Sequence, residues 1–198
     1  MDAAAKISDA EIFVHVRILL GVVVSLSIAR LLSGLAFFVQ HPGRQKADAV
    51  HLLWVASMLL ALVHFWWWQF ALIHHSAWHF GVYAFVLFYA TLNYMLCAIL
   101  FPTDLDEYVG FRDYFESRRV WFFGLMALSL LVDVVDSVIK GHDYLAAFSI
   151  EYPIRLAVYL LLFTLAAALR HRGFQLVFAI ANLVYQMSWI LRIYNQAS

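Results

Sequence analysis

Apolar residues gather in six long runs along this 198-residue chain, and short polar or glycine- and proline-containing breaks separate the runs. A bilayer core about 30 Å thick needs roughly 20 mostly apolar residues for each helix that crosses it, and each run comes close to that length or exceeds it. The pattern therefore predicts six membrane-spanning helices, over residues 12–39, 50–73, 79–101, 120–139, 144–169 and 174–194.

The links between the runs are short, apart from residues 103–119, TDLDEYVGFRDYFESRR. In this link Leu105, Tyr108, Phe111 and Phe115 recur at near-helical spacing, which is typical of an amphipathic helix lying at a membrane surface. We predict an all-α integral membrane protein of one domain over residues 1–198. Its fold would be a six-transmembrane-helix bundle with a short interfacial helix between the third and fourth spans.

The composition agrees with the membrane class, since 65% of the residues are hydrophobic, 13% are charged and the mean hydropathy is +0.80. Soluble domains are about half apolar and a quarter charged. The 13 basic and 13 acidic residues cancel, which argues against nucleic acid as a partner. We expect the lipid bilayer as a partner, together with a homo-oligomer or a larger membrane complex. The short links leave no room for a soluble catalytic domain, which favours a protein that is not an enzyme without deciding the matter.

Lysine and arginine are unevenly shared between the two sides of the predicted bundle. The N-terminal 13 residues lack the order of a signal peptide, so we expect the first run to stay as a membrane helix. The links after the first, third and fifth runs contain Arg44, Lys46, Arg112, Arg118, Arg119, Arg170 and Arg172, whereas the other side has Lys6, Arg17, Lys140 and Arg192. Because cytoplasmic loops are rich in lysine and arginine, we expect a multi-pass protein of an inner or plasma membrane with both termini non-cytoplasmic.

Several ionisable side chains lie inside the apolar runs, where each costs several kcal/mol unless it is paired or hydrated. With six spans, most of these residues fall in the half of the membrane on the side of the termini. The residues that we expect to form a proton or ion pathway there are Arg17, His64, Asp133, Asp136, Glu151 and Arg155.

The spacing of these charges leaves two interpretations open. Asp133 and Asp136 are three residues apart and share one helical face, while Glu151 and Arg155 are four apart and can pair along the fifth helix. Pro153, between the latter two, is expected to kink that helix. Such a group of residues can form a proton or cation pathway, or it can be a static ion-pair network that locks the helices together.

Histidines give a weaker indication of a metal site. His75 and His79 are four residues apart in HHSAWH and could present two imidazoles to one metal, with His15 as a further ligand. Histidines near a membrane surface also act as anchors, and we favour that interpretation here. His64 could be an axial haem ligand, although a hydrogen bond to a carboxylate of the fourth helix is favoured. The cofactor stays open between none, haem and a divalent metal.

Three functional classes follow from these residues. We expect a proton- or cation-conducting channel or transporter that uses the charges of the predicted pathway. The alternatives are a non-catalytic membrane subunit or assembly factor of a larger complex, and a metal- or haem-binding redox membrane protein.

Overall fold

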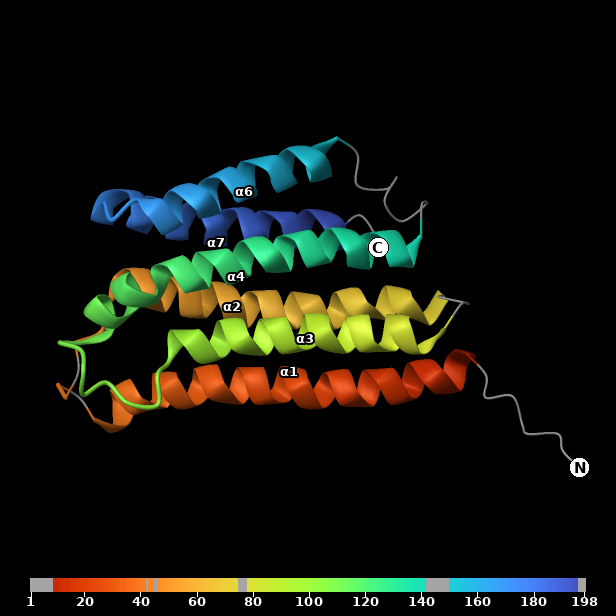
Figure 1. The fold of residues 1–198 in the computed structure, drawn as a ribbon, viewed down its shortest axis with the longest axis horizontal. Helices are drawn as coiled ribbons and strands as arrows, with labels where there is room; N and C mark the ends of the chain where they lie inside the picture. The colour runs from red at the N-terminus through yellow and green to blue at the C-terminus, as the bar shows by residue number, and fades with distance from the viewer. Residues whose placement is uncertain (1–8, 42, 45, 75–77, 142–149, 196–198) are drawn as a thin grey trace, which may run out of the picture.

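The computed structural model describes residues 9–41, 43–44, 46–74, 78–141 and 150–195, and this part of the chain contains helices and no β-strand (Figure 1). In chain order the elements are α1 (Asp9–Gln40), α2 (Ala49–Trp68), the short 3₁₀ helix η1 (Gln69–His74), α3 (Phe80–Leu100), α4 (Phe111–Lys140), α6 (Glu151–Ala168) and α7 (Arg172–Asn195).

Six of these helices are long and apolar enough to cross a membrane, as the sequence predicted. All six expose large apolar side chains on their outer faces, among them Ile18, Val63, Phe88, Trp121 and Val184. Apolar surface of this extent is rare on soluble monomers and is expected where helices face lipid. The chain is therefore an all-helical protein of the membrane class.

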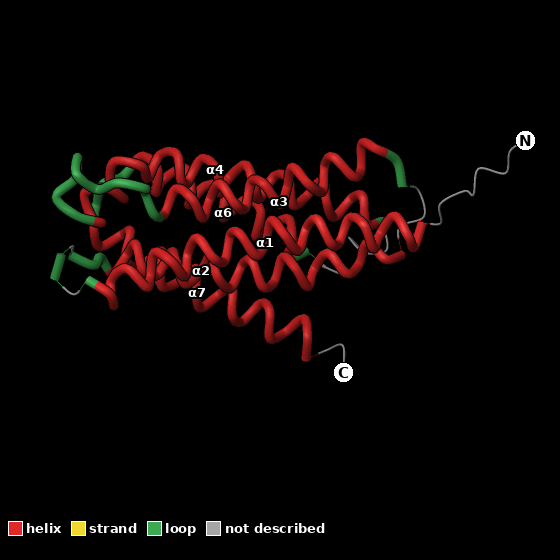
Figure 2. Tube along the Cα trace, turned by 90° about the horizontal axis from the view of Figure 1, so that it is seen from below, coloured by secondary structure: helices red, strands yellow, loops and turns green. Residues whose placement is uncertain are grey.

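Neighbouring helices along the chain run in opposite directions, so the start of α1 and the end of α7 lie at the same end of the bundle (Figure 1). We call this the terminal end, and the opposite end, which contains residues 41, 43–44, 46–48, 101–110 and 169–171, the connector end. The helices α1, α3, α4 and α6 pack side by side in a row, while α2 packs on α1, α3 and α4, and α7 packs on α2. Figure 2 shows α2 and α7 on one side of the bundle and α3, α4 and α6 on the other.

The fourth helix begins earlier than predicted, and the separate interfacial helix before it is not confirmed. Residues 101–110 contain no helix, and residues 111–119 are the first turns of α4 itself. The aromatic face of this segment packs into the bundle, since Phe111, Tyr114 and Phe115 are at most 5% exposed. Burial of these rings against the connector end explains why they do not form a helix on the membrane surface.

Two other helix boundaries differ from the prediction. The second predicted span is α-helical only to Trp68 and continues as the 3₁₀ turns of η1. The fifth predicted span is described from Glu151 onward, and residues 144–149 lie outside the described residues. Pro153 consequently lies in the first turn of α6, where a backbone N–H has no acceptor within the helix. The expected kink in the middle of the fifth span therefore loses its basis.

Arginine side chains join the helices at the connector end. Arg30 on α1 donates from Nη2 to the carbonyl oxygen of Phe101, just after α3, at 2.6 Å. Arg119 on α4 donates from Nε to the carbonyl oxygen of Ala167, near the end of α6, at 3.0 Å. The last carbonyls of a helix have no partner within it, so these guanidinium groups satisfy acceptors that lipid could not.

Candidate functional site

A cavity of about 180 Å³ lies between α2, α3, α4, α6 and α7, and extends from the middle of the bundle toward the terminal end. Aromatic and aliphatic side chains form much of its wall. Its polar lining residues are His64, Tyr89, Asn93, Ser129, Asp133, Arg155, Tyr159, Asn182, Tyr185 and Gln186. A cavity of this size and polarity has room for several water molecules or for one small solute.

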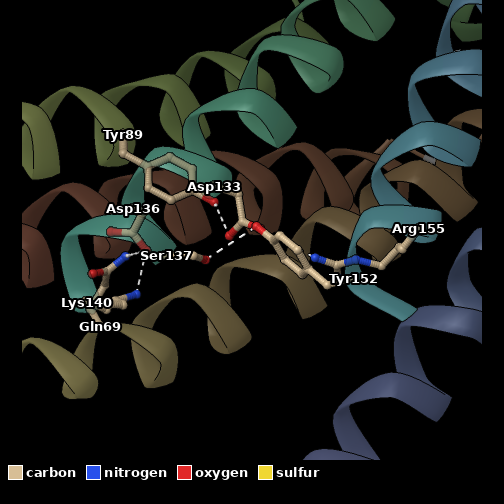
Figure 3. Close-up of polar contacts among 8 residues, drawn as sticks. All are labelled: Gln69, Tyr89, Asp133, Asp136, Ser137, Lys140, Tyr152 and Arg155. Carbon is tan, nitrogen blue, oxygen red and sulfur yellow. Dashed lines mark hydrogen bonds and ion pairs between the residues drawn. The ribbon is translucent and has the colours of Figure 1, made fainter. Parts of the chain in front are cut away.

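Asp133 is a carboxylate that lines this cavity, and Figure 3 shows it between the side chains of Tyr89 and Tyr152. Its Oδ1 accepts a hydrogen bond from the hydroxyl of Tyr89 on α3 at 3.3 Å, and its Oδ2 accepts one from the hydroxyl of Tyr152 on α6 at 3.0 Å. Arg155 Nη2 also donates to Oδ2, at 3.4 Å. Asp133 on α4 thus connects three helices through its side chain.

The guanidinium group of Arg155 is held between two aromatic rings. Its centre lies 4.7 Å from the ring centroid of Trp189 on α7 and 5.1 Å from that of Tyr152. The side chains of Arg155 and Asp133 are 17% and 16% exposed, so neither is fully enclosed by protein. These cation–π contacts fix the orientation of the charge that Arg155 brings to the cavity.

The pairing predicted along the fifth helix, between Glu151 and Arg155, does not form. Arg155 pairs with Asp133 on α4, and Glu151 pairs with Arg192 on α7 at 2.7 Å and accepts from the Tyr185 hydroxyl at 3.1 Å. Because Glu151 is in the first turn of α6, its side chain reaches the terminal end of α7 and not the cavity. The Glu151 side chain is 40% exposed and does not line the cavity.

Asp136 has a different environment from Asp133, one helical turn away. Its Oδ2 lies 2.5 Å from Nζ of Lys140, and both side chains are fully buried. The amide of Gln69 in η1 donates to the same oxygen at 3.5 Å (Figure 3). Asp136 does not line the cavity, and its close pairing gives it the character of a structural ion pair.

Of the two remaining predicted pathway residues, one lines the cavity and one does not. His64 on α2 lines it, and its ring contacts that of Trp68 edge to face at 5.2 Å. Arg17 lies outside it, with its guanidinium group 4.6 Å from the ring centroid of Phe70 and 5.9 Å from that of Trp66. The structure therefore joins His64, Asp133 and Arg155 in one cavity and leaves Arg17 with the aromatic side chains between α1 and α2.

The predicted metal ligands are only partly described. His75 lies outside the described residues. His79 precedes α3, and its Nδ1 accepts from the backbone N–H of Gly81 at 3.1 Å, while His15 is exposed on α1. Within the described ranges, no three histidine, cysteine, aspartate or glutamate side chains come close enough to hold a metal ion.

The cavity ends at a layer of aromatic side chains on its connector side, which we call the aromatic layer: Trp54, Phe122, Phe123, Phe163 and Phe178. The ring of Trp54 lies 5.3 Å from those of Phe122 and Phe123 and 5.4 Å from that of Phe178. All five rings are at most 5% exposed. This layer separates the polar cavity from the connector end.

Polar side chains in the middle of the bundle lie next to the aromatic layer, on the side of the terminal end. Asn182 on α7 donates to Oγ of Ser57 on α2 at 2.5 Å, and the same oxygen lies 2.9 Å from the side-chain amide of Gln186. These contacts join α2 to α7, and Asn182 and Gln186 also line the cavity.

Several residues of the site were not found from the sequence. Lys140 lies four residues after Asp136, a spacing that indicates an ion pair on a helix, so this partner could have been recognised. Tyr89 and Tyr152 carry no such signal. Ten tyrosines occur in the chain, and only packing decides which of them meet Asp133.

Comparisons of the chain with protein-family models, with curated proteins and with solved structures find no match. The functional argument therefore depends on the site.

Proposed function

We propose that this protein is a proton-conducting membrane transporter or channel, with Asp133 as the residue that carries the proton. The observation that carries the proposal is the polar cavity, which places Asp133 and Arg155 inside a bundle of membrane-spanning length. Ionisable side chains that line a cavity at membrane depth are rare, and they mark ion and proton pathways.

The contrast between the carboxylates supports Asp133 as this residue. Asp136 is enclosed with Lys140, and Glu151 is paired at the terminal end, so both have close cationic partners outside the cavity. Asp133 has only a long contact with Arg155 and hydroxyl donors that can reorient. A carboxylate with such partners can gain and lose a proton with little rearrangement of the helices.

The aromatic layer supports a gated pathway instead of an open pore. Water and protons can reach Asp133 from the cavity, but the five rings of the layer leave a dry region toward the connector end. Hydrophobic constrictions of this kind gate conduction by excluding water. Passage to the other side would then require the rings to move, which is the behaviour of a gate.

The experiment is proton flux into proteoliposomes that contain the purified protein. A potassium gradient with valinomycin supplies the driving force, and a pH-sensitive dye inside the vesicles reports proton entry. Asp133→Asn should reduce the protein-dependent flux on the order of tenfold or more, because the amide cannot carry a proton. Asp104→Asn, at an exposed carboxylate of the connector end, is the matched control and should leave the flux unchanged.

Two results would contradict the proposal. One is the absence of any protein-dependent proton flux in vesicles that contain folded protein. The other is an Asp133→Asn variant that folds, reconstitutes to the same density and conducts as well as the original chain.

The orientation of the bundle is part of the same proposal. The excess of lysine and arginine in the links of the connector end supports a cytoplasmic connector end and an external terminal end. The cavity would then face the external side of the membrane, which is the side from which a normal proton gradient drives protons inward.

A further inference from the structure

The hydrogen-bonding capacity around Asp133 and Arg155 is unequal. The carboxylate of Asp133 already accepts from Tyr89, Tyr152 and Arg155. A guanidinium group carries five N–H donors. Within the described part of the chain, Arg155 makes one hydrogen bond, the 3.4 Å contact to Asp133, and its Nε has no partner. Arg155 therefore has N–H donors to spare, whereas each oxygen of Asp133 already accepts at least one hydrogen bond.

We infer that the cavity binds a small organic carboxylate with an apolar body, and that Arg155 is the residue that binds its anionic group. The planar donor fork of arginine matches the two oxygens of a carboxylate. A cationic ligand is disfavoured, because it would approach the positive charge of Arg155 and find the oxygens of Asp133 already engaged.

The walls and the size of the cavity fit such a ligand. Phe65, Phe163 and Trp189 supply apolar surface beside the polar groups. The cavity volume is about 180 Å³. An apolar cavity of about 150 Å³ engineered in another protein holds benzene. A single aromatic ring with one carboxylate is therefore a suitable probe.

Arg155 is also held in place for this role. The rings of Trp189 and Tyr152 lie on the guanidinium group and limit its freedom before any ligand binds. A side chain that is already ordered loses less entropy when it binds an anion. The same rings would contact the apolar body of the ligand near its carboxylate.

The inference depends on the proposed function in one respect, which is the coupling between anion binding and protonation of Asp133. A bound carboxylate competes with Asp133 for Arg155, and a protonated Asp133 competes less, so anion binding and protonation of Asp133 should favour each other. The groups around Asp133 are His64 on α2, Tyr89 on α3, Tyr152 and Arg155 on α6 and Tyr185 on α7, with Asp136 and Lys140 on its own helix. Since several of these can titrate, substitution separates their roles better than pH does.

The test measures equilibrium binding of radiolabelled benzoate to the purified full chain in detergent, with benzylammonium as a cation of similar shape. Arg155→Gln should weaken benzoate binding about tenfold or more, since a charge-assisted pair of hydrogen bonds is lost. Asp133→Asn should strengthen it several-fold by removing the competitor. Arg112→Gln breaks an exposed arginine–carboxylate pair outside the cavity and should change nothing.

The opposite effects of the two cavity variants distinguish a binding role from a structural one, because a loss of folding weakens binding in both. If Arg155→Gln does not fold, Arg155→Lys keeps the charge without the fork and should still weaken binding. Saturable binding of benzylammonium in place of benzoate, no benzoate binding by folded protein, or undiminished binding by a folded Arg155→Gln variant would each overturn the inference.

The two proposals fail separately. Proton flux that depends on Asp133 together with no benzoate binding would leave the proposed function and remove this inference. Benzoate binding that depends on Arg155 without any proton flux would leave a carboxylate site and remove the proposed function.

Discussion

Asp133 and Asp136 are chemically identical and one helical turn apart, yet their surroundings give them different roles. Asp136 is enclosed with Lys140, and both of these side chains are fully buried. Asp133 lines a cavity, is 16% exposed and has a long contact to its cationic partner. A buried ion pair adds little net stability compared with apolar residues of similar volume in its place. Removal of one partner is nevertheless costly, because it leaves an uncompensated buried charge. We therefore expect the buried pair to be structural, and we assign the carboxylate in the cavity to the proposed function.

Lys140→Met tests the structural role of the buried pair. The substitution leaves the Asp136 carboxylate without its cation, and we expect the free energy of unfolding to fall by about 3–5 kcal/mol. Denaturation of the purified protein in detergent micelles, followed by circular dichroism, measures this change.

The double variant Asp136→Leu, Lys140→Met is the control for this prediction. It removes both charges, so it should recover a large part of the stability lost in the single variant. A double variant no more stable than Lys140→Met would show that the pair acts through something other than its charges.

At the scale of the elements, α1 and α3 approach closely at the connector end because Gly34 leaves room for the ring of Phe101. A Cβ atom placed on Gly34 would lie 2.3 Å from Cγ of that ring, far inside van der Waals contact. The hydrogen bond from Arg30 to the carbonyl of Phe101 holds the same two helices together at 2.6 Å. Close packing at a small residue and one interhelical hydrogen bond are the interactions that join helices when lipid removes the hydrophobic driving force.

Gly34→Ala should lower the stability by about 1–3 kcal/mol, because the ring of Phe101 must shift to admit the methyl group. Gly124→Ala on α4 is the matched control, since a Cβ atom there meets nothing within 4 Å. In a helix interior, alanine is favoured over glycine by about 1 kcal/mol, so the control should be neutral or slightly stabilising. Thermal unfolding of both variants in the same detergent measures the difference. Equal melting temperatures for the two variants would mean that α1 and α3 do not meet at Gly34.

At the scale of the whole molecule, the six antiparallel helices place both ends of the described chain together (Figure 1). Three helices, α1, α2 and α3, lie between Asp9 and Asp104, so these residues belong to opposite ends of the bundle. The cavity extends toward the end that contains Asp9, and the aromatic layer separates it from the end that contains Asp104. Which end faces the cytoplasm therefore decides from which side the cavity is reached.

Cysteine labelling tests this topology. Cys97 is the one cysteine of the chain and is buried, so Cys97→Ala provides a background without cysteine. In that background, Asp9→Cys should react with a membrane-impermeant maleimide added to intact cells, and Asp104→Cys should react only after the membrane is opened. Labelling of both positions from the same side would contradict an odd number of crossings between them. The reverse pattern would keep the six spans and invert the proposed orientation.

The sequence was a good guide to which segments form helices long enough to cross a membrane, and a poor guide to where α4 begins and how charged side chains pair. Run length and hydropathy are local properties, so six helices of membrane-spanning length could be predicted directly from the chain. The start of α4 at Phe111 was missed because Arg112, Asp113 and Glu116 make this part of the chain polar on one face. Only the fold shows that the other face packs into the bundle.

The candidate site was predictable in part for the same reason. Depth along a helix follows from residue number, so a gathering of charges near the terminal end could be expected from the six-span count. Partner choice depends on how each helix is rotated about its axis, which a count of spans does not give. Glu151 was therefore assigned to Arg155 although it pairs with Arg192, and Arg17 was grouped with a cavity that it does not line.

By itself, the sequence determined the membrane class of the protein and the number of helices long and apolar enough to cross a membrane, because run length and hydropathy belong to each segment alone. The tertiary structure decided which charges are locked and which line a cavity, because pairing and enclosure depend on atoms from different helices. Asp133 and Asp136 show the difference most directly. Lys140, four residues after Asp136, indicates the buried ion pair from the sequence, but only packing brings Asp133 to Arg155 and to the cavity.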